Sequence, residues 1–180
     1  MMNRYVALLR AVNVAGHVRL RSAQIERLFR AAGARDVVSF GHAGNVLFGA
    51  LRGAAVVAKV RDAIARQHGE RPVIVLRAAA ELVELVAAEP FAACGARRAD
   101  KLYVVFLARK PARLPRLPST SSAERLTAFA RHGHHVLIVS RRKPSGFYGF
   151  PNAFVETAFG VPATARNWST VTQLAALLAR

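Results

Sequence analysis

The stretch VVSFGHAGNVLFGAL, residues 37–51, decides the fold class. Residues 37–42 and 45–51 are rich in β-branched and aromatic side chains, and Ala43-Gly44 between them has the small, flexible character of a tight turn. Two strands joined in this way form a β-hairpin. The stretch therefore predicts an antiparallel sheet.

Strands and helices alternate on either side of this hairpin. Before it, residues 5–12 predict a strand. Apolar side chains from residue 25 to residue 32 then recur at i, i+3, i+4 and i+7, which predicts a helix that Ser22 caps and Gly33 ends. After it, the sequence predicts a helix from Gly53 to Gly69, a strand over residues 72–76 and a short helix over residues 81–89.

The same order of elements is predicted again further along the chain. Residues 101–108 predict a strand, and a connector with three prolines follows. Ser121-Ser122-Ala123-Glu124 is a capping box, which predicts a helix through Arg131. The remaining predictions are strands over residues 136–140 and 146–150, a helix over 151–159, an edge strand over 163–167 and a closing helix over 169–180.

These patterns together predict an α+β fold of two tandem βαββαβ halves, residues 1–95 and 100–180. Each half is expected to form an antiparallel sheet with helices on one face. The boundary between the halves is expected near residues 94–100.

Two stretches near the ends of the chain resemble a known family. Residues 8–17, LLRAVNVAGH, with GNVLF at residues 44–48, resemble the N-terminal signature of the family named domain of unknown function 1697. Residues 163–171, ATARNWSTV, resemble its C-terminal signature. The resemblance covers essentially the whole chain. It implies two ferredoxin-like (α/β-plait) subdomains and no assigned activity.

The chain departs from the family pattern in its N-terminal part. The family usually has glycine where Ala11 and Ala15 stand, and a Gln-Ser pair where His42-Ala43 stand. If the usual Gln and Ser take part in a site, that site is altered here.

Charge is the most unusual bulk property. The chain has 27 Lys and Arg against 10 Asp and Glu, a formal net charge of +17, and after residue 100 its acidic side chains are Glu124 and Glu156. The electrostatic field of such a large positive charge attracts polyanions. The excess of arginine and the abundance of alanine are also typical of a GC-rich genome, so the sequence leaves the purpose of the charge open.

Composition also suggests where the protein works. No apolar stretch approaches the roughly 20 residues of a membrane span, and Arg10 interrupts the N-terminal apolar run, unlike a signal peptide. We therefore expect a cytoplasmic protein with no membrane partner. The single Cys94 is expected to be a structural thiol that forms neither an internal disulfide nor a cysteine-built zinc site.

No strong catalytic motif is present, and no cofactor is expected. The string from Ser140 to Lys143 matches S-x-x-K of penicillin-recognising enzymes, but its companion motifs are missing. His132, His134 and His135 are close enough to bind a metal, but no carboxylate near them in sequence would complete the site. The sequence predicts no metal site.

The first candidate site is a basic loop followed by an aromatic segment. Residues 141–145 carry three cations, and GFYGF at residues 146–150 is similar to the Gly/aromatic strand on which RNA-recognition motifs stack bases. Ordinary core packing is the alternative interpretation. The candidate nucleic-acid-binding residues are Arg141, Arg142, Lys143, Phe147 and Tyr148.

The second candidate site gathers polar residues from both signatures. Free N–H groups at a helix N-terminus attract an anion, and Arg166 precedes such a terminus. Helix capping and core satisfaction are the alternative interpretation. The candidate ligand-binding residues, expected to converge on one polar patch, are Arg10, Asn13, Asn45, Arg166, Asn167, Trp168 and Thr170.

Two classes of function stay open at this point. The protein is either a non-catalytic binder of an anionic ligand, RNA or DNA among them, through its basic second half, or an enzyme. The enzyme would act on a small phosphate- or carboxylate-bearing substrate held by Arg10, Asn13, Arg166 and Asn167. The sequence leaves the oligomeric state open.

Overall fold

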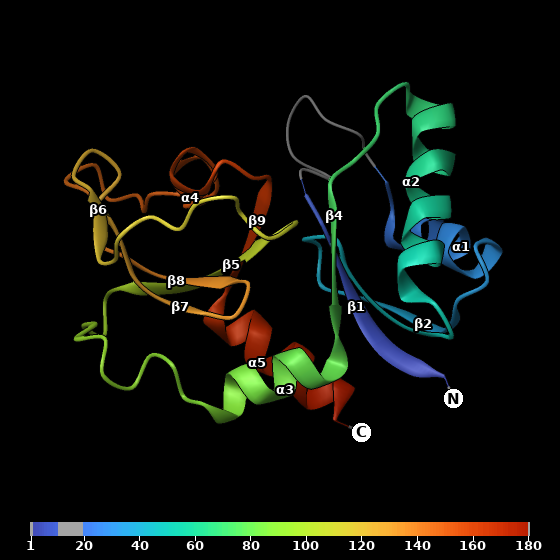
Figure 1. Cartoon of the computed structure of the whole chain (residues 1–180), viewed down its shortest axis with the longest axis horizontal. Coiled ribbons are helices and arrows are strands. Elements are labelled where there is room, and N and C mark those ends of the chain that lie inside the picture. The colour runs from blue at the N-terminus through green and yellow to red at the C-terminus, as the bar shows by residue number, and fades with distance from the viewer. Residues whose placement is uncertain (1, 11–19, 180) are drawn as a thin grey trace. The chain divides into compact units, whose positions relative to one another are not determined.

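A computed structural model describes residues 2–10 and 20–179 of the chain. It is a mixed α+β structure with one four-stranded and one five-stranded antiparallel sheet. The chain divides into two compact units (Figure 1). The first unit is Met1–Val83 together with Leu174–Arg180, and the second unit is Glu84–Gln173.

The first unit holds the four-stranded sheet, with strand order β2-β3-β1-β4. Both hairpin strands predicted from the sequence are present and pair antiparallel. Its elements in chain order are β1 (Asn3–Leu9), α1 (Ser22–Ala31), β2 (Arg35–Phe40), β3 (Asn45–Ala50), α2 (Gly53–His68), β4 (Ile74–Ala78) and α3 (Ala79–Ala87), whose last residues belong to the second unit.

Helices α1 and α2 cover one face of this sheet (Figure 1). Phe29 of α1 is fully buried, with its ring centroid 5.1 Å from that of Phe48 on β3. Gly44 makes the hairpin possible, because its φ is 69° and a Cβ there would lie 2.9 Å from the Cβ of Leu9. The apolar face predicted for residues 25–32 is thus the face that α1 buries, with Ile25 and Phe29 in the core.

The second unit holds the five-stranded sheet, with strand order β6-β7-β8-β5-β9. Helix α4 packs on one face, where Val155 and Phe159 join a buried cluster with Val105 and Ile138. Strand β9 is an edge strand, as the sequence predicts. The elements are β5 (Lys101–Leu107), β6 (Ser119–Ser121), β7 (Leu126–His132), β8 (His135–Ser140), α4 (Asn152–Phe159), β9 (Ala163–Asn167) and α5 (Trp168–Leu178), whose last residues belong to the first unit.

The helix predicted from the capping box is wrong. The Ser121 hydroxyl accepts a hydrogen bond from the Glu124 N–H at 3.3 Å, as in a capping box, but this bond closes a turn. Arg125 then takes a φ of 51°, which no helix continues. Leu126 and Ala128 alternate into the core as residues of β7, so burial on the sheet overrides the local helix signal.

The strand predicted over residues 146–150 is also wrong. This segment has a single β-bridge, between Arg142 and Tyr148. The reason is that β8 already has strand partners on both edges, β7 and β5, so it offers no position for another strand. The predicted element order βαββαβ therefore fails in the second half, where a proline-containing connector and β6 take the place of the first helix.

The two sheets share one detail of sequence position. Arg77 is the fourth of the five residues of β4, and Arg166 is the fourth of the five residues of β9. Each is buried, and each donates from its Nη1 to the carbonyl of the preceding residue, at 2.7 Å for Arg77 and 2.8 Å for Arg166. A helix begins directly after each strand.

Candidate functional site

The basic loop, residues 141–150, folds back on the turn between β6 and β7. The Arg141 N–H donates to the carbonyl of Arg125 at 2.9 Å. The Ser140 hydroxyl donates to the carbonyl of Gly149 at 3.2 Å, and the Lys143 ammonium lies 2.8 Å from the Glu124 carboxylate. Two contacts therefore hold the start of the loop on the turn, and a third ties the end of the loop to β8.

Two adjoining hollows lie along this junction, of about 350 Å³ and about 590 Å³. Both are lined by Ser122 and Arg125, and we call them together the basic groove. The first adds Arg141 and the hydroxyl-bearing residues Thr120, Ser121 and Thr127, and the second adds Lys143 and Ser145. Cations beside hydroxyl donors form the lining that phosphate oxygens prefer.

The backbone of Arg125 holds its side chain at the groove. Its left-handed φ is uncommon for arginine and persists because both of its peptide groups are bonded, the N–H to Ser122 at 3.2 Å and the carbonyl to Arg141. The side chain is exposed. Sequence reasoning missed Arg125 because it placed this segment in a helix.

Two aromatic residues of the loop, Phe147 and Tyr148, differ in how many contacts their side chains make. The Lys143 N–H donates to the carbonyl of Phe147 at 2.8 Å, so the Phe147 backbone lies next to a residue of the groove, and 75% of the Phe147 surface is exposed. The Tyr148 hydroxyl instead donates to the carbonyl of Ala99, and the Lys101 ammonium covers its ring, 4.5 Å from the centroid. Phe147 is therefore available for stacking, whereas Tyr148 anchors the loop.

Arg142 also stabilises the conformation of the loop. Its guanidinium Nε donates to the carbonyl of Gly146 at 2.9 Å, which turns the side chain back on its own loop. Of the five residues predicted for nucleic-acid binding, Arg141 and Lys143 line the groove, and the carbonyl of Phe147 is bonded to Lys143. The S-x-x-K string is part of the same anchor, since both its Ser140 and its Lys143 are engaged within the unit.

The second predicted site is spread over both units. In the first unit, Arg10 follows β1, is half-buried, and donates its N–H to the carbonyl of Val73 at 2.9 Å. The buried amide of Asn45 donates to the carbonyl of Phe40 at 3.0 Å and so braces the hairpin. Asn13 lies outside the described residues.

The remaining residues of that site belong to the second unit. Arg166 is buried and donates to the Thr164 hydroxyl at 2.8 Å, and burial lowers the pKa of its guanidinium to about 10. Asn167 is exposed at the end of β9, while Trp168 and Thr170 are half-buried in the first turn of α5. That these residues share one polar patch with Arg10 stays a prediction.

The histidines and the cysteine lie in a turn and a connecting segment, and they do not form a metal site among the described residues. His132 and His135 are register partners at the β7–β8 turn, and the ring of His135 lies edge-on to Phe106. Among residues 2–10 and 20–179, no group of three or more metal-ligating side chains occurs. Cys94 is half-buried in the segment that leads to β5. Within the same residues, no helix is long and apolar enough to cross a membrane.

The fold and groove define a basic α+β protein with two antiparallel sheets. The family model described as protein of unknown function (DUF1697) matches residues 2–136 of the 180. The chain belongs to this family, as its N-terminal signature predicts.

Comparison with solved structures shows the same fold elsewhere. The conserved bacterial protein SP0830 from Streptococcus pneumoniae is 15% identical to this chain, with a TM-score of 0.67 over 99% of each chain. At this identity the likeness shows the fold alone. No curated protein matches the sequence.

Proposed function

We propose that the protein is a non-catalytic binder of single-stranded nucleic acid, through the basic groove and the ring of Phe147. One observation carries the proposal: Arg125, Arg141 and Lys143 line one groove with hydroxyl donors, and Phe147, whose carbonyl is bonded to Lys143, is 75% exposed. A single strand presents the complementary combination, in which anionic phosphates alternate with the flat apolar faces of bases.

Each component has a separate task in this interaction. The planar guanidinium groups of Arg125 and Arg141 donate two parallel hydrogen bonds to a phosphate, and the lining hydroxyls supply further donors. An unpaired base stacks on Phe147, which contributes about 1–3 kcal/mol without reading the sequence. The net charge of +17 speeds encounter with any polyanion.

A single strand fits this surface better than a duplex. The bases of a duplex are stacked on one another, so the exposed ring of Phe147 would find no free base face. Moreover, the groove lies on a turn and a loop, and the second unit directs no helix of the kind that enters a major groove toward it. We therefore expect weak sequence preference and steep salt dependence.

The experiment is a fluorescence polarisation titration with a labelled single-stranded oligonucleotide at several salt concentrations. The test variant is Arg125→Ala with Arg141→Ala. The matched control is Arg113→Ala with Arg116→Ala, which removes the same charge from exposed positions of the connector. Loss of two phosphate contacts should weaken binding by at least about tenfold and lower the salt slope by about 1.4, and the control should change affinity by less than about threefold.

Two results would overturn the proposal. An equal loss in both double variants would show that net charge alone attracts the strand, without the groove. Absence of binding at low salt would exclude nucleic acid altogether. Phe147→Ala adds an independent check, since it should reduce affinity by about tenfold and leave the salt slope unchanged.

We also propose that residues 1–95 and residues 100–180, each of which holds the whole of one sheet, are diverged copies of one ferredoxin-like plan. The strand order β2-β3-β1-β4 corresponds to β7-β8-β5-β9 if β6 is taken as an addition. Arg77 and Arg166 support this correspondence by their equal place in the last strand. An experimental structure in which these two sets of strands fail to superpose would contradict it.

A further inference from the structure

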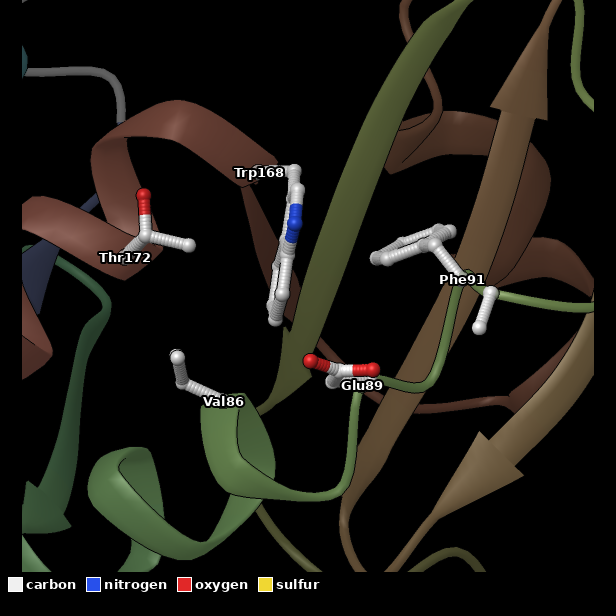
Figure 2. Close-up of a pocket in the computed structure, with 6 residues that line it drawn as sticks. Val86, Glu89, Phe91, Trp168 and Thr172 are labelled. Atoms are coloured by element: carbon white, nitrogen blue, oxygen red, sulfur yellow. The ribbon is translucent and has the colours of Figure 1, made fainter.

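A second pocket, with the opposite charge preference, lies inside the second unit. It is found where the segment after α3 passes the start of α5, and its volume is about 350 Å³. Figure 2 shows the Trp168 indole edge-on, with Phe91 on one side and Val86 and Thr172 on the other. The Glu89 carboxylate lies at the lower edge of the ring in this view.

The two aromatic walls are held in place from behind. The ring centroids of Phe91 and Trp168 are 5.0 Å apart and the rings are tilted by 58°, so they enclose an angle and do not stack flat. Phe129 supports Phe91 from 5.5 Å. Phe129 lies where the register of β7 shifts against β8, and such a bulge re-aims a side chain. The walls are therefore formed before any ligand arrives.

Glu89 is the charged residue of this lining. Its carboxylate is exposed and makes no ion pair or hydrogen bond with the described residues, although the chain carries 27 cationic side chains. Its backbone is fixed in a left-handed conformation, with φ 43°, by bonds to Val86 and Ala92 of 3.1 Å and 2.9 Å. The backbone from which the Glu89 side chain extends is thus held at the pocket.

We propose that this pocket binds a small organic cation with an apolar body, such as an alkylated ammonium. The faces of aromatic rings attract cations, and a carboxylate nearby adds a direct Coulomb attraction. Methyl groups on the nitrogen match Val86 and the rings, and they need no hydrogen-bond acceptor. An anion would be repelled by Glu89, and a metal ion would find one carboxylate where it needs several ligands.

The volume fits this class of ligand. Pockets for small molecules begin at about 300 Å³, so a site of this size accepts a compact cation. The Thr172 hydroxyl already donates to the carbonyl of Ser169 at 2.9 Å, which leaves charge and shape as the main means of recognition. This site is separate from the basic groove, so the two proposals can fail independently.

Trp168 makes the test direct, because it is the one tryptophan of the sequence and its fluorescence reports on the pocket alone. The probe is choline, and its neutral isostere 3,3-dimethyl-1-butanol is the comparison ligand. Choline should change the fluorescence saturably, and the isostere should bind about tenfold more weakly because it lacks the charge.

Two variants that each remove one negative charge test whether choline binds at this pocket. Glu89→Gln keeps the shape of the side chain and should weaken choline binding by about fivefold to tenfold. Glu84→Gln removes a charge from an exposed position of α3 outside the pocket and should leave binding unchanged. Equal binding of choline and its isostere, unchanged choline binding in Glu89→Gln, or no saturable response in the wild-type protein would overturn the proposal.

Discussion

Replacement of Gly149 by alanine tests how closely the basic loop is seated on the β6–β7 turn. A Cβ at this position would lie 2.2 Å from the carbonyl oxygen of Glu124, about 1.2 Å short of the 3.4 Å at which ordinary contact begins. The obstacle is backbone, so no side chain can swing away. The loop must move off the turn, which weakens the Ser140–Gly149 and Lys143–Glu124 contacts.

The cost of such overpacking is about 1–3 kcal/mol. In a chain of this length each kcal/mol lowers the melting temperature by about 2–4 °C. The same movement separates Lys143 from Arg125 and so should weaken oligonucleotide binding although no charge has been removed. The assays are thermal unfolding and the polarisation titration described above.

A matched control separates steric clash from backbone strain. Gly95 has a φ of 63° and nothing within 4 Å of an added Cβ, so Gly95→Ala introduces strain without a clash. It should destabilise by about 1 kcal/mol and leave nucleic-acid binding intact. If Gly149→Ala has the melting temperature and the oligonucleotide affinity of the wild-type protein, the close contact between the loop and the turn does not exist. The basic groove, which is lined by both, would then not have the shape described above.

Two further predictions concern ionisable groups. The Ser39 N–H, and after it Arg30, hold the pKa of Glu26 below its ordinary value, so this carboxylate stabilises the fold above that ordinary value and ceases to do so as the pH falls through the lowered one. Urea unfolding should therefore show Glu26→Gln to be about 1 kcal/mol less stable than the wild type at pH 7, and this difference should shrink as the pH falls through the lowered pKa of Glu26. A difference in stability that stays constant with pH would contradict this expectation. Arg166→Ala should lower the free energy of unfolding by about 3 kcal/mol, because the buried Thr164 hydroxyl and the carbonyl before Arg166 lose their donor. A loss below about 1 kcal/mol would show that these bonds do not hold the strand.

The fold of the first unit was largely predictable because its local signals and its burial agree. The glycine at position 44 suits the hairpin, and Gly69 ends α2 with a φ of 75°. In the second unit the capping-box signal at residues 121–124 is real but local, and strand pairing overrode it. A single sequence carries little information on which strand edges are already occupied.

The candidate sites were predictable in composition and less so in geometry. Cations at positions 141 and 143 were identified from the charge run, and both line the groove. Arg125 and some of the hydroxyl-bearing residues of the groove belong to a turn for which the sequence predicts a helix. The aromatic pocket joins Phe91 to Trp168 across most of the second unit, and no periodicity links residues so far apart.

The short strand β6 limits strand pairing between copies of this protein at one edge of the five-stranded sheet. It covers the edge of β7 from Leu126 to Ala128, and the bulge that follows twists the rest of that edge. With three residues of its own and Pro118 before it, β6 offers few backbone groups to a neighbouring chain. If copies of the protein gather on one polyanion, as the proposed function implies, their local concentration is high, and the blunted edge at β6 then keeps a neighbouring copy from adding a strand there.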